Sequence, residues 1–228
     1  MIVMNQDEAR ERLLFLSERA ATEGEPLRWF EELYSGANRD WEEIPWADLQ
    51  PNPVMIKWLE GRGISGRSLV VGCGLGDDAV WLSEIGFEVV AFDISQSCID
   101  WCKERFPDSG VDWRVADLLT PPDEWFGTFD LVVEIHILQA IPSGDIRDDA
   151  VANLSRLLSE RGCLLCIGRL DDGGGLAVQP PPWPLKQSWL VGSFPNLTQV
   201  SFESFVLPET PEVTRFVAAW SGDASSIS

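Results

Sequence analysis

The chain has 228 residues and a formal net charge of −20, because 37 Asp and Glu side chains outnumber 17 Lys and Arg side chains. No Lys/Arg cluster reverses that sign locally, so nucleic acid and anionic membrane surfaces are disfavoured as partners, and a small molecule is favoured. Hydrophobic residues make up 45% of the chain, including 11 Trp and 11 Phe, so a globular core is expected, and the length fits one domain.

The first sixty residues are expected to be mostly helical. Helical spacing of apolar residues predicts helices over 6–21 and 27–34, followed by a Trp- and Pro-rich loop. Pro53 suits the first turn of a third helix that runs to residue 60. The N-terminus lacks the basic and apolar regions of a secretory signal, and no apolar run is long enough to cross a membrane.

A regular alternation of strands and helices begins near residue 67. Apolar runs predict strands that are buried on both faces, and the intervening patterns are helical; this combination indicates a doubly wound parallel sheet. The expected strands are 68–72, 87–93, 111–117, 129–135 and 162–168, and the expected helices are 78–85, 96–105 and 146–159.

The pattern changes after the fifth strand. Residues 171–184 contain three Gly and four Pro, which break both helices and strand ladders. A short helix at 186–194 and strands at 197–207 and 212–220 follow. Because no crossover helix separates these two strands, they should pair as an antiparallel hairpin, which gives seven strands in all.

The five cysteines are odd in number and lie in apolar segments, as expected for free thiols in a reducing cytoplasm. Cys163 and Cys166 have the spacing of a zinc half-site. However, no second pair has ligand spacing, and His136 is the only histidine. No metal site is therefore expected.

The most informative stretch is LVVGCGLGDD, a strand that enters a helix through Gly72, Gly74 and Gly76. Glycines allow a tight turn and close approach of a ligand to the backbone. The next strand ends in Asp93, 17 residues after Gly76, near the spacing of an acid that binds ribose. Together they indicate an adenosine-type ligand; the alternative is a structural turn with a surface Asp.

The ligand is better matched by S-adenosylmethionine than by a nicotinamide cofactor. The glycine spacing is not G-x-G-x-x-G, and Asp77 and Asp78 would repel a pyrophosphate at the helix N-terminus, whereas S-adenosylmethionine has no phosphate and carries a cationic sulfonium. The Tyr-x-x-x-Lys pair of short-chain reductases is absent, because the only tyrosine, Tyr34, is followed by Asn38 at the lysine position.

The motifs GCGLGDD, AFDIS, VADLL and FDLVVEIH, with a late hairpin, resemble class I S-adenosylmethionine-dependent methyltransferases over about residues 29–220. More narrowly, CGLGDDAVWLSEIGFEVVAFDIS and the preceding WFEELY and PWADLQPNP resemble the thiopurine and tellurite-resistance branch, which acts on small molecules. The resemblance implies a single Rossmann-like domain. Its parts would be an N-terminal helical lid (1–62), a core with a seven-stranded, mostly parallel sheet (63–221) and a tail (222–228).

The resemblance also implies cofactor contacts. The backbone of Gly72, Cys73 and Gly74 would pass the methionine part, with the acid Asp78 just beyond. Glu134, at the end of the fourth strand, would face the methionine and the methyl-transfer zone, or else be a solvated acid at a strand end.

The adenosine half would be held by the next two strand ends. Asp93 would bind both ribose hydroxyls, Ile94 would pack on adenine, and Ser95 would cap the next helix. Asp117 would accept from the adenine amine, and Leu118 would offer its backbone to the ring.

Three residues are candidates for the acceptor side. His136 could remove a proton from the acceptor, or be a hydrogen-bonded structural residue. Trp46 is expected to contact the cofactor and, with Trp183, to wall the acceptor pocket; the alternative is simple loop anchoring. Few positive charges are expected to line this pocket, which favours a neutral or thiol acceptor over tellurite or halide.

Two other functions remain open at this point: an NAD(P)-dependent reductase, and a non-catalytic S-adenosylmethionine-binding protein. The sequence EIHI stands where exocyclic-amine and glutamine methylases carry an Asn-Pro-Pro-Tyr-type motif, which argues against those enzymes.

Overall fold

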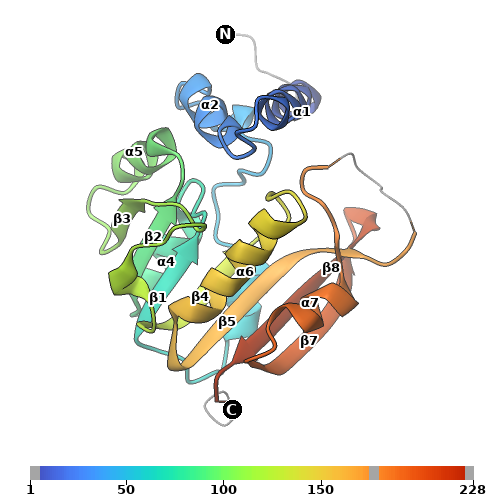
Figure 1. Ribbon diagram of the computed structural model, residues 1–228. Coiled ribbons are helices and arrows are strands. Elements are labelled where there is room, and N and C mark those ends of the chain that lie inside the picture. Colours follow the sequence, from blue (N-terminus) through green and yellow to red (C-terminus); the bar gives the residue numbers. More distant parts are fainter. Residues whose placement is uncertain (1–5, 175–179, 224–228) are drawn as a thin grey trace.

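The computed structural model describes residues 6–174 and 180–223. A sheet forms its centre, in the strand order β3-β2-β1-β4-β5-β8-β7, and a short strand, β6, pairs with β5 outside this path (Figure 1). The strands are β1 (Arg67–Val71), β2 (Glu88–Asp93), β3 (Asp112–Val115), β4 (Phe129–Ile135), β5 (Leu158–Asp171), β6 (Leu185–Lys186), β7 (Thr198–Leu207) and β8 (Thr210–Ser221).

Strands β1 to β5 are parallel, whereas β8 runs antiparallel to both β5 and β7. This arrangement confirms the Rossmann-like α/β fold and the terminal hairpin. The seven expected strands form the path, and the two-residue β6 is an eighth. Strand β5 is longer than expected, because it begins directly after α6, where Leu158 already pairs with Phe129 of β4.

Helices cover both faces of the sheet. The helices are α1 (Gln6–Thr22), α2 (Trp29–Gly36), α3 (Pro53–Leu59), α4 (Asp77–Glu84), α5 (Gln96–Arg105), α6 (Asp145–Leu157) and α7 (Gln187–Ser193), with 3-10 turns η1 (Trp41–Glu43) and η2 (Asp123–Trp125). Helices α6 and α7 pack on one face of the sheet, and α3, α4 and α5 pack on the other. Apolar strand residues fill both interfaces, as expected for a parallel sheet.

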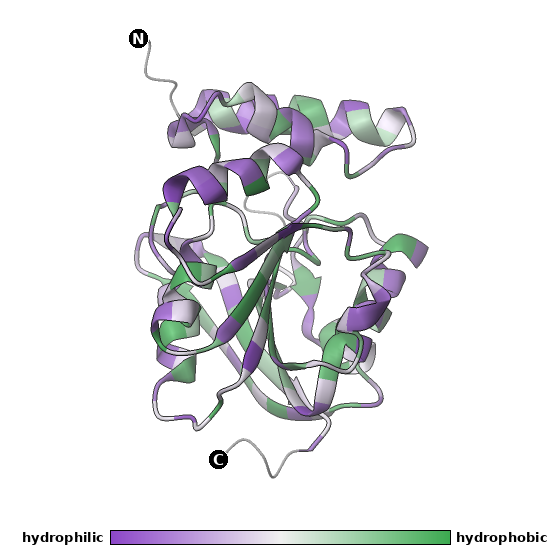
Figure 2. Cartoon of the chain, turned by 90° about the vertical axis from the view of Figure 1, so that its left-hand side faces the viewer, coloured by the Kyte–Doolittle hydropathy of each residue, from purple (hydrophilic) through white to green (hydrophobic). Residues whose placement is uncertain are grey.

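The N-terminal helices α1 and α2 lie across one end of the sheet (Figure 2). Their apolar side chains form a separate cluster that reaches Leu75, beyond β1, and Cys98 and Trp101 on α5. Helix α3 instead packs on a face of the sheet, with Pro53 in its first turn and Asn52 as its N-cap. The residues expected to form a lid, 1–62, therefore divide between two places, and most of the expected tail lies outside the described residues.

Glu31 of α2 joins this end layer to the sheet. Its carboxylate accepts hydrogen bonds from the hydroxyls of Ser95 (2.7 Å) and Ser97 (2.6 Å) and from the Ser97 N–H (3.1 Å), at the start of α5. Although burial opposes it, these hydrogen bonds lower the pKa of Glu31. Helix α2 is thereby held over the carboxyl end of β2.

Candidate active site

The site begins at the turn between β1 and α4. Gly72 and Gly74 both adopt left-handed backbone conformations, with φ of +58° and +55°. A Cβ on Gly72 would lie 2.3 Å from the Ile137 side chain, so only glycine fits there. The turn thus brings its backbone against the space above the sheet, where the parallel strands end.

That space is a cavity of about 390 Å³, within the range of small-ligand sites. It lies between the glycine turn, the end layer of α1 and α2, and the ends of β4 and β5. Its lining includes Gly72, Cys73, Gly74, Asp77, Asp78, Asp93, Leu13, Trp29, Phe30, Tyr34, Trp46, His136, Arg10 and Arg169.

A second, smaller cavity of about 50 Å³ adjoins the first. The two share Phe30, Val71, Gly72, Asp93 and Ile137 in their linings. The smaller cavity is also lined by the expected adenine-side residues Ile94, Asp117 and Leu118. The structure therefore brings these three together beside Asp93, as the sequence motifs predict.

Two of the acids that line the larger cavity are the buried Asp93 and the half-buried Asp78. The Asp93 carboxylate accepts the N–H of Ser95 (3.0 Å) and faces the N–H of Gly74 (3.4 Å), and burial raises its pKa to about 6. Asp78 accepts the N–H of Asn52 (2.6 Å), and burial likewise raises its pKa to about 6. Asp77, by contrast, is paired with the guanidinium of Arg105 at 2.8 and 2.9 Å.

Two of the expected cofactor residues line neither cavity. Ser95 is buried and caps α5, where its hydroxyl accepts the Cys98 N–H (3.0 Å), as expected of a cap. Glu134 is only 1% exposed; its carboxylate accepts the Leu138 N–H (2.9 Å), and burial raises its pKa to about 7. Glu134 is therefore neither a solvated acid nor a residue that lines either cavity.

Aromatic side chains close the cavity opposite the glycine turn. Trp46 is 42% exposed; its indole N–H donates to the hydroxyl of Tyr34 (3.2 Å), and its ring meets those of Trp29 and Phe30 edge-on. Trp183 does not line the cavity. Its backbone N–H and carbonyl are hydrogen-bonded to Gln139, and the neighbouring Pro181 and Pro182 line the cavity instead.

The far side of the cavity carries positive charge that the sequence reading missed. Arg169, at the end of β5, lines the cavity together with Arg10 of α1, and Arg215 of β8 is the direct cross-strand partner of Arg169. None of the ion pairs among the described residues involves Arg169. Burial, followed by the charges of Arg10 and Arg215, lowers its pKa. The expectation of little positive lining is therefore wrong.

One local signal could have found Arg169, which is the first charged residue after the apolar run GCLLCIG. Like charges directly opposite in an antiparallel pair are destabilising. A pair of which one member lines a cavity suggests a ligand that offsets the repulsion.

His136 lines the cavity where β4 ends. Its Nδ1 lies 2.9 Å from Oε1 of Gln139, whose own amide donates to the carbonyls of Arg169 and Trp183. That amide orientation makes Nδ1 the protonated nitrogen and leaves Nε2 with a free lone pair. Burial, with Arg169 and Arg215, lowers the pKa of His136 to about 4, so the ring is neutral near pH 7.

Comparison with known families shows what this site is similar to. Residues 69–166, which span β1 to β5, match the model of a methyltransferase domain. This segment is similar to a methyltransferase domain. The match covers the glycine turn, Asp93, Asp117 and His136.

The chain is also similar to methyltransferases of known name. Magnesium-protoporphyrin O-methyltransferase of Rhodobacter capsulatus is 32% identical over 55% of this chain and 59% of its own length. Thiocyanate methyltransferase 1 of Brassica oleracea is 27% identical over 77% of both chains. The chain spans between 33% and 59% of the length of the first three curated relatives.

Solved structures share the fold of the methyltransferase domain. The Burkholderia thailandensis 1,6-didemethyltoxoflavin-N1-methyltransferase, with 1,6-didemethyltoxoflavin and S-adenosylhomocysteine bound, superposes with a TM-score of 0.64 at 18% identity, over 84% of each chain. No helix among the described residues is both long and apolar enough to cross a membrane.

Proposed function

We propose that the protein is an S-adenosylmethionine-dependent methyltransferase that methylates a small molecule, with a thiol or another soft nucleophile favoured as acceptor. The distribution of charge in the larger cavity carries the proposal. Asp93 ends β2 and Arg169 lies near the end of β5, three strand positions away, or about 14 Å. A cationic cofactor suits the acidic side, and an electron-rich acceptor suits the basic side.

The adenosine half of the cofactor would lie where the two cavities adjoin. Asp93 would accept both ribose hydroxyls, Ile94 would pack on the adenine ring, and Asp117 and Leu118 would read its edge. These roles rest on the shared lining of the two cavities and on the motif positions.

The methionine half fits the larger cavity. Gly72, Cys73 and Gly74 would run their backbone along it, and Asp78 would face its ammonium. The hydroxyl of Tyr34 and the indole nitrogen of Trp46 lie close to Gly74, so these two side chains would border the methionine half. Ser95 and Glu134 would act indirectly. Ser95 caps α5 and donates a hydrogen bond to Glu31, and Glu134 accepts a backbone N–H from the turn that carries His136.

When bound, the cofactor supplies a methyl group that an acceptor takes by in-line displacement, so the chain must mainly position the two reactants. His136 would offer Nε2 to a proton on the acceptor, with Gln139 fixing the ring. Because the pKa of His136 is about 4, it suits an acceptor that gives up its proton easily, such as a thiol. Arg169 would stabilise the resulting thiolate or another anionic nucleophile.

Calorimetry and product analysis test the proposal. We expect S-adenosylhomocysteine to bind the chain, and NAD(P) not to bind. Methylated product should form with members of a panel of thiocyanate, thiols, selenols, tellurite, halides and phenols, beginning with the anion named for the Brassica relative. Tight NAD(P) binding without a response to S-adenosylhomocysteine would indicate a reductase, and binding without any product would indicate a non-catalytic protein.

Replacing Arg169 with Met tests the acceptor side. We expect the KM of an anionic acceptor to rise about ten- to a hundredfold, with an unchanged Kd for S-adenosylhomocysteine, because one charged hydrogen bond is lost. Arg114→Met, at an exposed Arg paired with Asp112, should change neither value. The opposite split, a weaker cofactor and an unchanged KM, would assign Arg169 to the cofactor carboxylate.

The five described cysteines are all buried and unpaired, which supports a cytoplasmic location as part of the proposal.

A further inference from the structure

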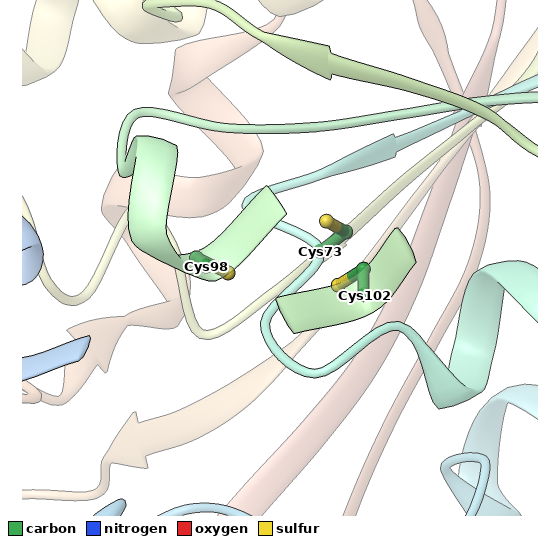
Figure 3. A group of neighbouring side chains, drawn as sticks. All are labelled: Cys73, Cys98 and Cys102. Atoms are coloured by element: carbon green, nitrogen blue, oxygen red, sulfur yellow. The ribbon is translucent and has the colours of Figure 1, made fainter. Parts of the chain in front are cut away.

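Three cysteine thiols meet beneath the glycine turn. Cys98 and Cys102 lie on successive turns of α5, and Cys73 faces them from the turn after β1 (Figure 3). The three Sγ atoms all lie within 4.8 Å of one another. They surround one oxygen, the Gly74 carbonyl, at 2.9 Å from Cys98, 3.1 Å from Cys102 and 3.9 Å from Cys73.

This spacing is close to that of a coordination site. With metal–sulfur bonds of about 2.3 Å, sulfurs sharing one ion lie about 3.8 to 4.0 Å apart. A small contraction of the cluster would reach that value. The group holds three sulfur donors, with no His, Asp or Glu as a fourth ligand among the described residues.

Because the three thiols are buried, the net charge of the complex determines which ion suits them. Cys98 and Cys102 are 0% exposed and Cys73 is 8% exposed, so a charged complex would carry a large desolvation cost. Three thiolates with a monovalent or divalent cation would leave a net negative charge beside the buried Asp93. With a trivalent centre the complex is neutral.

We propose that Cys73, Cys98 and Cys102 form a binding site for a trivalent thiophilic metalloid, of the class of arsenous acid. Three S–H bonds and three As–O bonds break, three As–S bonds form, and the three protons leave with the hydroxyls as three water molecules. No atom is oxidised or reduced. Arsenous acid is small and uncharged, and it can reach the cluster from the larger cavity, which Cys73 lines.

The chemistry of the cluster favours this exchange. Hydrogen bonds from Cys73 and Cys98, together with the nearby Arg105, lower the pKa of Cys102, which eases the loss of its proton. This site differs from the Cys163–Cys166 spacing considered from the sequence, because those two thiols lie on opposite faces of the sheet.

Arsenite titration of the reduced full-length chain, without cofactor, tests the site. We expect one equivalent to bind, with As–S ultraviolet absorption and a native mass gain of one arsenic less three hydrogens. Cys98→Ala and Cys102→Ala should abolish this complex, whereas Cys163→Ala, at a buried cysteine outside the cluster, should keep it. Equal binding by all variants, or no binding by the wild type, would overturn the site.

Thermal melting provides a second readout that does not depend on the variants folding alike. Arsenite should raise the melting temperature of the wild type and of Cys163→Ala, because it binds only the folded cluster. A larger rise with Zn²⁺ than with arsenite would overturn the trivalent assignment.

Arsenite bound at the thiol cluster should also weaken cofactor binding. This consequence rests on the proposed function. Once the thiols lose their protons, the Gly74 carbonyl loses its donors, and the turn that faces the cofactor must adjust. We expect arsenite to weaken S-adenosylhomocysteine binding about tenfold, and the cofactor product to protect against arsenite equally. Unchanged affinity would overturn the coupling alone, whereas no S-adenosylhomocysteine binding before arsenite is added would count against the proposed function alone.

Discussion

Asp78 and Asp93 show how burial tunes single residues of the cavity. Each carboxylate accepts a backbone N–H, yet burial raises both pKa values to about 6, and none of the ion pairs among the described residues involves either acid. Asp93 could be located from the motif spacing alone. Its raised pKa could not, because it depends on the end layer of helices that excludes water.

These pKa values predict pH-dependent cofactor binding. Below about pH 6 both acids become protonated and lose their attraction for a cation, so the affinity for S-adenosylmethionine should fall as the pH is lowered through 6. Calorimetry across this range checks the effect, and Asp93→Asn should flatten the profile. A profile that stays flat in the wild type would contradict the assignment.

The raised pKa of Glu134 predicts that the free energy of unfolding depends on pH. Its pKa is raised from 4.5 to about 7 by burial, so the folded state favours the protonated form, and its stabilisation is lost as the pH rises through 7. Glu134→Gln should therefore increase the free energy of unfolding at pH ~8 by on the order of 1 to 3 kcal/mol, and change it little at pH ~4.5.

Denaturant unfolding at the two pH values measures this difference. Glu84→Gln, at an exposed carboxylate on α4, serves as the control and should have no such pH-dependent effect. An equal gain for Glu134→Gln at both pH values would mean that charge is not the cause.

At the scale of elements, the strands and most helices follow from hydrophobic periodicity and from turn residues, which are local. The position of α3 does not. Its sequence predicts a helix, as the two segments before it do, but only the packing of Met55, Trp58 and Leu59 places it on a face of the sheet rather than in the end layer. The length of β5 is likewise set by its partner, β4.

The hydrogen bonds of Glu31 to the start of α5 predict that this residue helps to hold the end layer, α1 and α2, in place. Glu31→Ala removes the acceptor of three hydrogen bonds, which should cost on the order of 1 kcal/mol locally and loosen α1 and α2 over the cavity. We expect faster amide exchange in both helices and weaker S-adenosylhomocysteine binding.

Glu32→Ala is the matched control, because the partners of Glu32 in ion pairs among the described residues, Arg19 and Arg28, lie inside the end layer. It should leave cofactor affinity unchanged. If both variants weaken the cofactor equally, the link between α2 and α5 is not what holds the layer in place.

At the scale of the whole molecule, the net charge of −20 predicts a response to salt. Self-repulsion is screened as the Debye length falls from about 30 Å at low ionic strength to about 8 Å near 0.15 M. The melting temperature should therefore rise by a few degrees, while binding of cationic S-adenosylmethionine weakens. NaCl and KCl should act equally; a fall in melting temperature with either salt would contradict the prediction.

The sequence by itself determined the alternation of strands and helices, the glycine turn and the ribose-side acid, because each depends on residues close together in the chain. The tertiary structure decided the charge of the acceptor side and the thiol cluster. Arg10, Arg169 and Arg215 come from α1, β5 and β8, and meet only because β8 inserts between β5 and β7 while α1 lies across the strand ends. Contacts over such separations depend on the packing of the whole chain.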